Sequence, residues 1–151
     1  MYLRREFLCS ILCTPFLLRE VYFANLDIVV YKDSTCGCCD GWIAHLKANG
    51  FLATVKEVDN TTLRKIKEDH RIPSALQSCH TGLIEGYVIE GHVPAESITR
   101  LLKESPKALG LVVPGMPAGS PGMEATKKEK YAVLLLGVNG QSSVYREYAD
   151  F

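Results

Sequence analysis

The sequence lacks an excess of charge of either sign. Its 17 lysines and arginines balance 17 aspartates and glutamates, and there is no basic block. Since binding to a phosphate backbone needs clustered positive charge, no nucleic acid partner is expected. The sequence also lacks the run of about 18 uninterrupted apolar residues that a membrane-spanning helix needs. We therefore expect no stable membrane span in the mature protein.

The composition is that of an ordinary folded domain. Hydrophobic residues make up 47% and charged residues 23% of the 151 residues, which argues against disorder. This length suits one domain with a substantial core, and the sequence shows no internal repeat. We therefore assign residues 25–151 to a single domain.

The first 24 residues are predicted to be a signal peptide. A basic segment, Met1–Arg5, precedes the apolar Phe7–Leu18, and Ala24 can precede a cleavage site. Residues Arg4–Leu8 resemble a twin-arginine signal, which exports proteins that are already folded or metal-loaded. We therefore expect cleavage and a periplasmic location. An amphipathic first helix docked on the domain is the other interpretation.

The rest of the chain is predicted to form a compact α/β domain. The β-branched run Leu26–Tyr31 predicts a strand, and apolar residues at helical spacing predict a helix over Cys39–Ala48. A strand over 51–58, a helix capped by 59–62, a hairpin split at Gly86 and a helix opened by 94–97 follow. This βαβαββα order is that of a thioredoxin-like fold. An additional C-terminal hairpin carries Asn139-Gly140, which predicts a type I′ turn.

Three cysteines lie within four residues, in the order Cys36-Gly37-Cys38-Cys39, between the first strand and the first helix. At a helix N-terminus, unpaired backbone N–H groups and the helix dipole stabilise a thiolate over a thiol. A dithiol formed by Cys36 and Cys39 can therefore form a disulfide or chelate a soft cation. Cys38 favours the metal, because a third thiol would scramble a disulfide but adds a donor to a cluster.

A second pair of soft ligands, Cys79-His80, precedes the predicted third strand. In thioredoxin-like folds this segment runs beside the CxxC loop, and thiolate with imidazole suits copper or zinc. His45 lies two helical turns, about 10 Å, beyond Cys38 and is expected at the surface. His92 lies in a predicted turn and is compatible with either the site or solvent.

A Pro/Gly-rich segment over residues 105–123 is predicted to be a long loop. It holds every methionine except the initiator, namely Met116 and Met123. A connection of this length without regular structure is usually functional or disordered. Thioether sulfur is a poor ligand for Zn²⁺ and a good one for Cu(I), so both residues favour copper. Packing of the two methionines against the core is the alternative.

Four motifs of the sequence agree in order and spacing with one known family. They are YKDSTCGCCDGW over 31–42, LQSCHTG over 76–82, GYVIEGHVPA over 86–95, and GLVVPGMPAGSPGM over 110–123. With these motifs the chain resembles the CopG-type bacterial copper-resistance proteins, a family also described as a domain of unknown function. The resemblance covers nearly the whole chain after Ala24.

The resemblance implies a thioredoxin-like fold, export to the periplasm or cell envelope, and copper binding. The expected cargo is Cu(I), held in a site of several thiolate-bridged ions for copper resistance, with interconversion of Cu(I) and Cu(II). A copper-delivery or efflux protein is the expected partner. Carried over by motif, the ligands are Cys36, Cys38, Cys39 and Cys79, with His80, Met116 and Met123 as additions.

Two other functions stay open. In a thiol–disulfide oxidoreductase, Cys36 would be the nucleophile and Cys39 the resolving thiol, and the metal-free protein would turn over a disulfide substrate. Cys38 and the methionine-bearing loop have no role in that chemistry. A structural Zn²⁺ site in an interaction module would use Cys36, Cys39, Cys79 and His80, and it leaves the methionines without a function.

Overall fold

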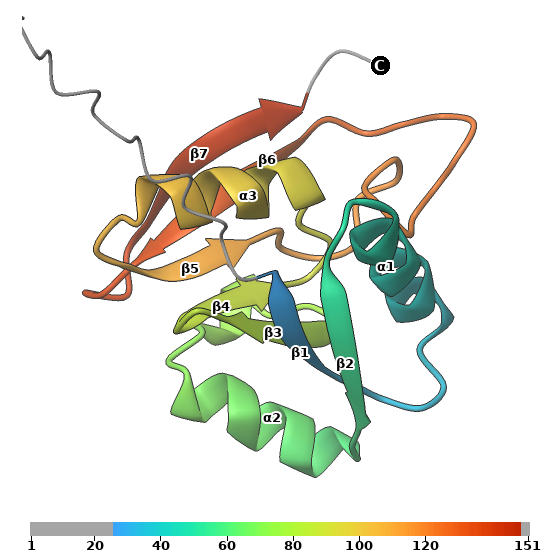
Figure 1. Ribbon diagram of the computed structural model, residues 1–151, viewed down its shortest axis with the longest axis horizontal. Coiled ribbons are helices and arrows are strands. Elements are labelled where there is room, and N and C mark those ends of the chain that lie inside the picture. The colour runs from blue at the N-terminus through green and yellow to red at the C-terminus, as the bar shows by residue number, and fades with distance from the viewer. Residues whose placement is uncertain (1–25, 149–151) are drawn as a thin grey trace, which may run out of the picture.

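The structure is a computed structural model that describes residues 26–148, so the predicted signal peptide lies outside the described residues. The described residues form one seven-stranded sheet with three α-helices (Figure 1). The elements are β1 Asp27–Lys32, α1 Gly37–Ala48, β2 Leu52–Glu57, α2 Asn60–Asp69, the 3₁₀ turn η1 Ser74–Leu76, β3 His80–Ile84, β4 Tyr87–Glu90, α3 Ala95–Glu104, β5 Ala108–Val112, β6 Tyr131–Gly137 and β7 Ser142–Tyr148.

The predicted mixed α/β class is confirmed, and so is the element order as far as α3. The strand order in the sheet is β2-β1-β3-β4-β5-β6-β7, with β2 parallel and β3 antiparallel to β1. α2 begins where expected, because the Asp59 side chain accepts a hydrogen bond from the Thr62 N–H at 2.8 Å. The finer assignment to the thioredoxin-like class stays a prediction.

Part of the segment expected to be loop forms the strand β5. β5 pairs in parallel with β4 and antiparallel with β6, so it joins the C-terminal hairpin to the rest of the sheet. A side chain at Gly110 would clash with the Val88 carbonyl oxygen. This glycine therefore permits close approach of two strands, whereas the sequence placed it in a long loop. On either side of β5, residues 105–107 and 113–130 have no regular structure.

The C-terminal hairpin is present, but the predicted type I′ turn is wrong. That turn needs positive φ at both central residues, whereas Gly140 has a φ of 81° and Asn139 is not in this region. The N–H groups of Gly140 and Gly137 donate to the carbonyls of Gly137 and Gln141, which closes a longer loop. The Asn139 side chain stabilises this loop by accepting a hydrogen bond from the Gln141 N–H.

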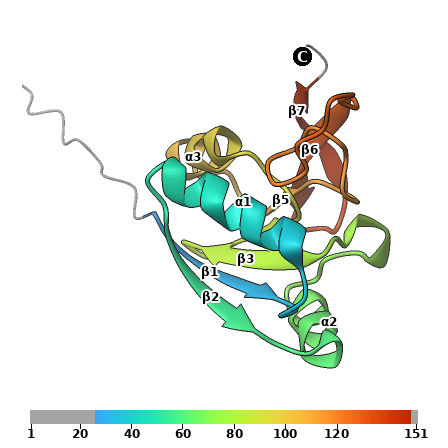
Figure 2. The same ribbon diagram turned by 90° about the vertical axis from the view of Figure 1, so that its right-hand side faces the viewer.

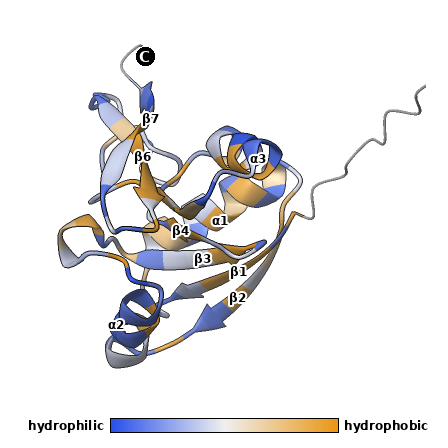
Figure 3. Ribbon diagram, turned by 90° about the vertical axis from the view of Figure 1, so that its left-hand side faces the viewer, coloured by the Kyte–Doolittle hydropathy of each residue, from blue (hydrophilic) through white to orange (hydrophobic). Residues whose placement is uncertain are grey.

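The helices lie on both faces of the sheet. Figure 2 shows α1 and α3 above strands β1 to β3, with α2 below them. Buried apolar side chains of α1 and α3, including Trp42, Leu46 and Ile98, belong to the main core. α2 is mostly hydrophilic, as Figure 3 shows, and buries Leu63. None of the helices in residues 26–148 is long and apolar enough to cross a membrane.

Candidate metal centre

Four cysteine sulfur atoms gather at the N-terminal end of α1. Cys36 precedes the helix, Cys38 and Cys39 lie in its first turn, and Cys79 directly precedes β3. All four Sγ atoms lie within 4.8 Å of one another. Cys38 is central, because its Sγ is 3.6 Å from that of Cys36 and 3.8 Å from that of Cys79. The structure thus brings together the four thiol positions that the sequence singled out.

Two of these sulfur atoms are joined to each other in this structure. Cys36 and Cys39 form a disulfide, whereas Cys38 and Cys79 are free thiols. The Cys39 side chain is fully buried and Cys36 is half-buried. A site that uses all four cysteines as thiolates therefore requires a two-electron reduction of this disulfide.

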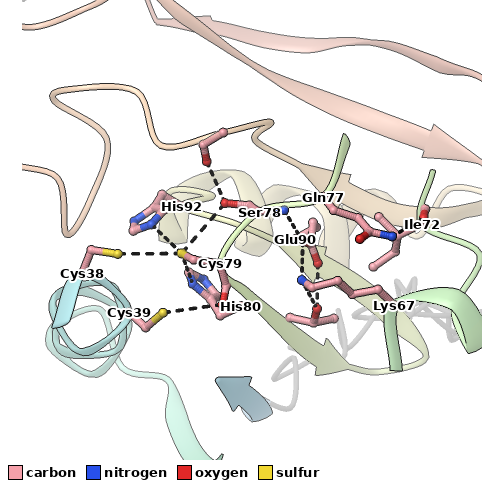
Figure 4. A network of polar contacts seen from close by, with 12 residues as sticks. Cys38, Cys39, Lys67, Ile72, Gln77, Ser78, Cys79, His80, Glu90 and His92 are labelled. Atoms are coloured by element: carbon pink, nitrogen blue, oxygen red, sulfur yellow. Dashed lines mark hydrogen bonds and ion pairs between the residues drawn. The ribbon is translucent and has the colours of Figure 1, made fainter. Parts of the chain in front are cut away.

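Two histidines complete a second group of ligands around Cys79. Its Sγ lies 3.3 Å from His80 Nδ1 and 3.2 Å from His92 Nε2 (Figure 4). Both imidazoles are fully buried, and within residues 26–148 the Nε2 atom of His80 has no hydrogen-bond partner. A buried nitrogen without a partner is costly in a site that binds nothing. The arrangement therefore fits a cation held by sulfur and nitrogen.

The tautomer of His92 follows from its second contact. Its Nδ1 lies 2.8 Å from the carbonyl oxygen of Pro121, which can only accept, so Nδ1 carries the proton. Nε2 of the neutral ring is then a lone-pair donor directed at Cys79. A backbone carbonyl that orients a histidine in this way is a common second-shell feature of metal sites.

Burial keeps Cys79 and the two histidines uncharged in the metal-free site. It raises the pKa of the Cys79 thiol to about 12, and the nearby Cys38 contributes to this increase. Burial also lowers the pKa of His80 well below its usual value of 6.5. Electrostatic interactions with His92 and Lys67 lower this pKa further. The site therefore holds a thiol and neutral imidazoles at neutral pH. A soft cation would displace the thiol proton and supply the missing positive charge.

The loop over residues 113–130 brings one of the two methionines to the cysteines. The exposed Met116 places its Sδ 3.9 Å from Cys38 Sγ, and the neighbouring Gly115 carbonyl accepts a 2.6 Å hydrogen bond from Ser78. For Met123 the structure shows backbone hydrogen bonds with Gly119 and Ser120, which place it in a turn. Its role as a ligand stays a prediction.

The same loop is held against α1 by a contact between two glycines. An added Cβ at Gly41 would lie 2.9 Å from the Gly122 Cα. At Gly122, where φ is +85°, a Cβ would lie 2.5 Å from the Trp42 nitrogen and 2.6 Å from the Cys38 oxygen. Because no larger residue fits, this close approach fixes the loop beside the turn that carries Cys38 and Cys39.

A buried ion pair positions the segment that carries Cys79. Glu90 accepts hydrogen bonds from Lys67 Nζ at 2.5 Å, from Thr81 Oγ1 at 2.7 Å and from the Ser78 backbone N–H at 2.6 Å. Lys67 also donates to Thr81. Both charged side chains are almost entirely buried, and Figure 4 shows them beside the Ser78–Cys79 segment. We call these four residues the Glu90 network.

His45 is not part of the site, but the expectation that it lies at the surface is wrong. It is half-buried, and its Nε2 accepts a 3.1 Å hydrogen bond from the Ala95 N–H at the start of α3. Burial accordingly lowers its pKa. His45 thus satisfies an unpaired helix N–H, which is a structural role.

The comparisons with known proteins identify the family. A family described as "Protein of unknown function, DUF411" matches residues 76–123. A solved structure named copper resistance protein CopG, form 2, is 45% identical, with a TM-score of 0.76, over 82% of this chain and 98% of that one. Form 1 is 44% identical, with a TM-score of 0.77, over 83% and 99%. The chain belongs to the CopG family. No curated protein matches it.

His92 is the residue at the CopG-family site that the sequence analysis left undecided. The register of the β3–β4 hairpin could have predicted that His92 lies at this site. The two strands of this hairpin are joined by a two-residue turn, and Thr81 pairs with Glu90 at the end far from the turn. Each further step away from the turn pairs the residue before Thr81 with the residue after Glu90. Two steps outward place Cys79 opposite His92, which is where the structure has them. Recognising Glu85-Gly86 as the turn would have predicted this contact.

Proposed function

We propose that this protein is an exported, periplasmic copper-binding protein that sequesters Cu(I) for copper resistance. The observation that carries the proposal is the convergence of four cysteine sulfur atoms that share Cys79 with two buried imidazoles. The family supports it, since both similar solved structures are named copper resistance proteins. The twin-arginine-like N-terminus supports export.

The ligand set favours copper over zinc. A structural Zn²⁺ site needs four ligands in a closed tetrahedron. This centre offers more donors than that, and the exposed thioether of Met116 lies beside Cys38. Thioether and thiolate are the soft donors that select Cu(I). Because Cu(I) takes few ligands and one thiolate can bridge two ions, we propose that the centre holds several ions.

We further propose that the bound copper changes between Cu(I) and Cu(II). Thiolates stabilise Cu(I), whereas imidazole nitrogen is also a suitable ligand for Cu(II). Cys79 lies at the boundary between the sulfur-rich group and the two histidines, so both kinds of ligand are within reach of one ion. A copper-delivery or efflux protein is the proposed partner, and a thioredoxin-like fold is the proposed class of the domain.

The test is an anaerobic Cu(I) titration of the fully reduced protein against a competing chelator, with Zn²⁺ in parallel. We expect tight uptake of more than one Cu(I), weaker Zn²⁺ binding, and a large loss of copper in Cys36→Ser and Cys39→Ser. His45→Ala is the control, because His45 contacts the start of α3 and none of the four sulfur atoms. Equal loss of copper in this variant would show that the centre lies elsewhere.

The disulfide supports a second function, that of a thiol–disulfide oxidoreductase. Cys36 and Cys39 form it at a helix N-terminus, where a thiolate is stabilised. This function predicts catalytic turnover of a disulfide substrate by the reduced, metal-free protein. Weak Cu(I) binding together with such turnover would replace the copper proposal.

A further inference from the structure

A polar groove adjoins the disulfide and has no role in the function proposed above. Its volume is about 650 Å³, within the range of small-molecule sites. Three segments form it: the loop between β1 and α1, the first turns of α2, and the residues that precede β3. Its lining includes Asp33, Cys36, Arg64, Lys67 and Cys79.

The groove gives access to one sulfur atom of the disulfide. Cys36 lines it and is half-buried. Cys39 does not line it, is fully buried, and directs its Sγ at the Cys79 carbonyl oxygen, 3.9 Å away. Because thiol–disulfide exchange requires direct approach to a sulfur atom, a nucleophile in the groove can attack only Cys36.

The charges of the groove indicate what it recognises. Arg64 is exposed on α2, and within residues 26–148 it has no ion pair or hydrogen bond. The other cation, Lys67, is already paired with Glu90. An unpaired guanidinium in a groove favours a carboxylate, which it can bind through two parallel hydrogen bonds. Asp33, in the loop between β1 and α1, also lines the groove and provides a negative charge for an ammonium group.

We propose that this groove binds a small thiol that carries a carboxylate, of the size of an amino acid or short peptide, and that this thiol reduces the Cys36–Cys39 disulfide. The inference rests on the proposed copper function, since reduction would restore the thiols that copper needs. Attack of the thiolate on Cys36 Sγ forms a mixed disulfide, and Cys39 leaves as a thiolate that takes up a proton. A second thiol then attacks the small-molecule sulfur, which releases Cys36 and a small disulfide. Two thiols thus lose the two electrons and two protons that the cysteines gain.

The experiment measures reduction of the disulfide in the full chain without copper. Glutathione and cysteine are compared with cysteamine and 2-mercaptoethanol, which lack a carboxylate, at equal thiolate concentrations. Alkylation and mass spectrometry follow the Cys36 and Cys39 thiols. We expect the rate to saturate with the two carboxylate-bearing thiols, and to be about tenfold to hundredfold lower for them in Arg64→Gln. Lys65→Gln, on an exposed position of the same helix that does not line the groove, should leave all rates unchanged.

The site of attack is tested by trapping. In the variant Cys38→Ser/Cys39→Ser/Cys79→Ser, which leaves no neighbouring thiol to displace it, glutathione disulfide should form a stable adduct on Cys36, and the adduct should form more slowly when Arg64→Gln is added. Equal rates for all four thiols, or no effect of Arg64→Gln on glutathione, would overturn the proposal. That result, with normal Cu(I) uptake after chemical reduction, would leave the copper function intact. Selective reduction by glutathione, without Cu(I) uptake, would instead overturn the copper function and support the proposal that the groove binds the thiol.

Discussion

Two buried polar clusters meet at the Ser78–Cys79 segment, and they differ in whether their polar groups have partners. In the Glu90 network every charged group has a partner, since Glu90 accepts from Lys67, Thr81 and the Ser78 N–H. In the candidate metal centre, by contrast, His80 Nε2 has no partner among residues 26–148, and two thiols are free. The two clusters lie side by side in Figure 4.

This difference separates a scaffold from a binding site. A satisfied buried network rigidifies the backbone around it, and removal of one member leaves an uncompensated charge. An unsatisfied cluster of soft donors has binding capacity that only a ligand can use. The first cluster therefore holds Cys79 in place, and the second binds copper in the function that we propose.

The largest expected effect comes from breaking the satisfied cluster. Lys67→Met leaves the buried Glu90 without its cation, and we expect the free energy of unfolding to fall by about 3–5 kcal/mol. Urea denaturation measures this change. The double variant Lys67→Met/Glu90→Gln should recover part of the loss, because it removes the unpaired charge. A loss below about 1 kcal/mol in the single variant would show that the pair is not the scaffold.

Removal of a ligand that both groups share should weaken copper binding and leave stability almost unchanged. Cys79→Ser keeps the shape of the side chain but removes the sulfur that both ligand groups share. We expect Cu(I) affinity to fall by more than about hundredfold, the upper range for loss of an outer-shell partner, with little change in stability. Competition with a chelator and urea denaturation measure the two quantities. Ser34→Ala, at an exposed position, is the control.

The contact between Gly122 and α1 should affect both stability and copper binding. Gly122→Ala introduces a Cβ that meets Trp42 and Cys38 backbone atoms at a residue with positive φ. We expect a loss of about 1–3 kcal/mol in stability and weaker Cu(I) binding, because the loop that carries Met116 must move. Gly37→Ala is the matched control, since a Cβ there meets nothing within 4 Å. Wild-type copper affinity in Gly122→Ala would show that the loop does not contribute.

Acid should destabilise the copper-free protein through His80. Its folded-state pKa lies well below the unfolded value of about 6.5, so the unfolded chain binds the proton first. The stability that His80 contributes is complete above pH 6.5. It decreases as the pH falls further, by at most about 1.4 kcal/mol per pH unit. Thermal unfolding between pH 7.5 and 5 measures this slope. His80→Gln should reduce it, and an unchanged slope in this variant would show that His80 is not its source.

The sequence predicts those elements of the fold whose residues carry a clear local pattern. The strand β1, the capped helix α2 and the split hairpin at Gly86 follow from β-branched runs, an Asp cap and a glycine. β5 was not predicted, because its glycine and short length resemble loop sequence. The reason for Gly110 is the approach of Val88, which belongs to a different strand. Local patterns contain no information on such a neighbour.

The residue types of the candidate metal centre were determined by the sequence itself. Three thiols before a helix and a Cys-His pair before a strand have few uses other than metal or redox chemistry. Only the tertiary structure decided which residues converge. It directed His92 at Cys79, brought Met116 to Cys38 and placed His45 against α3. The physical reason is that these contacts join segments far apart in the chain, so they depend on sheet register and on the packing of the loop over α1.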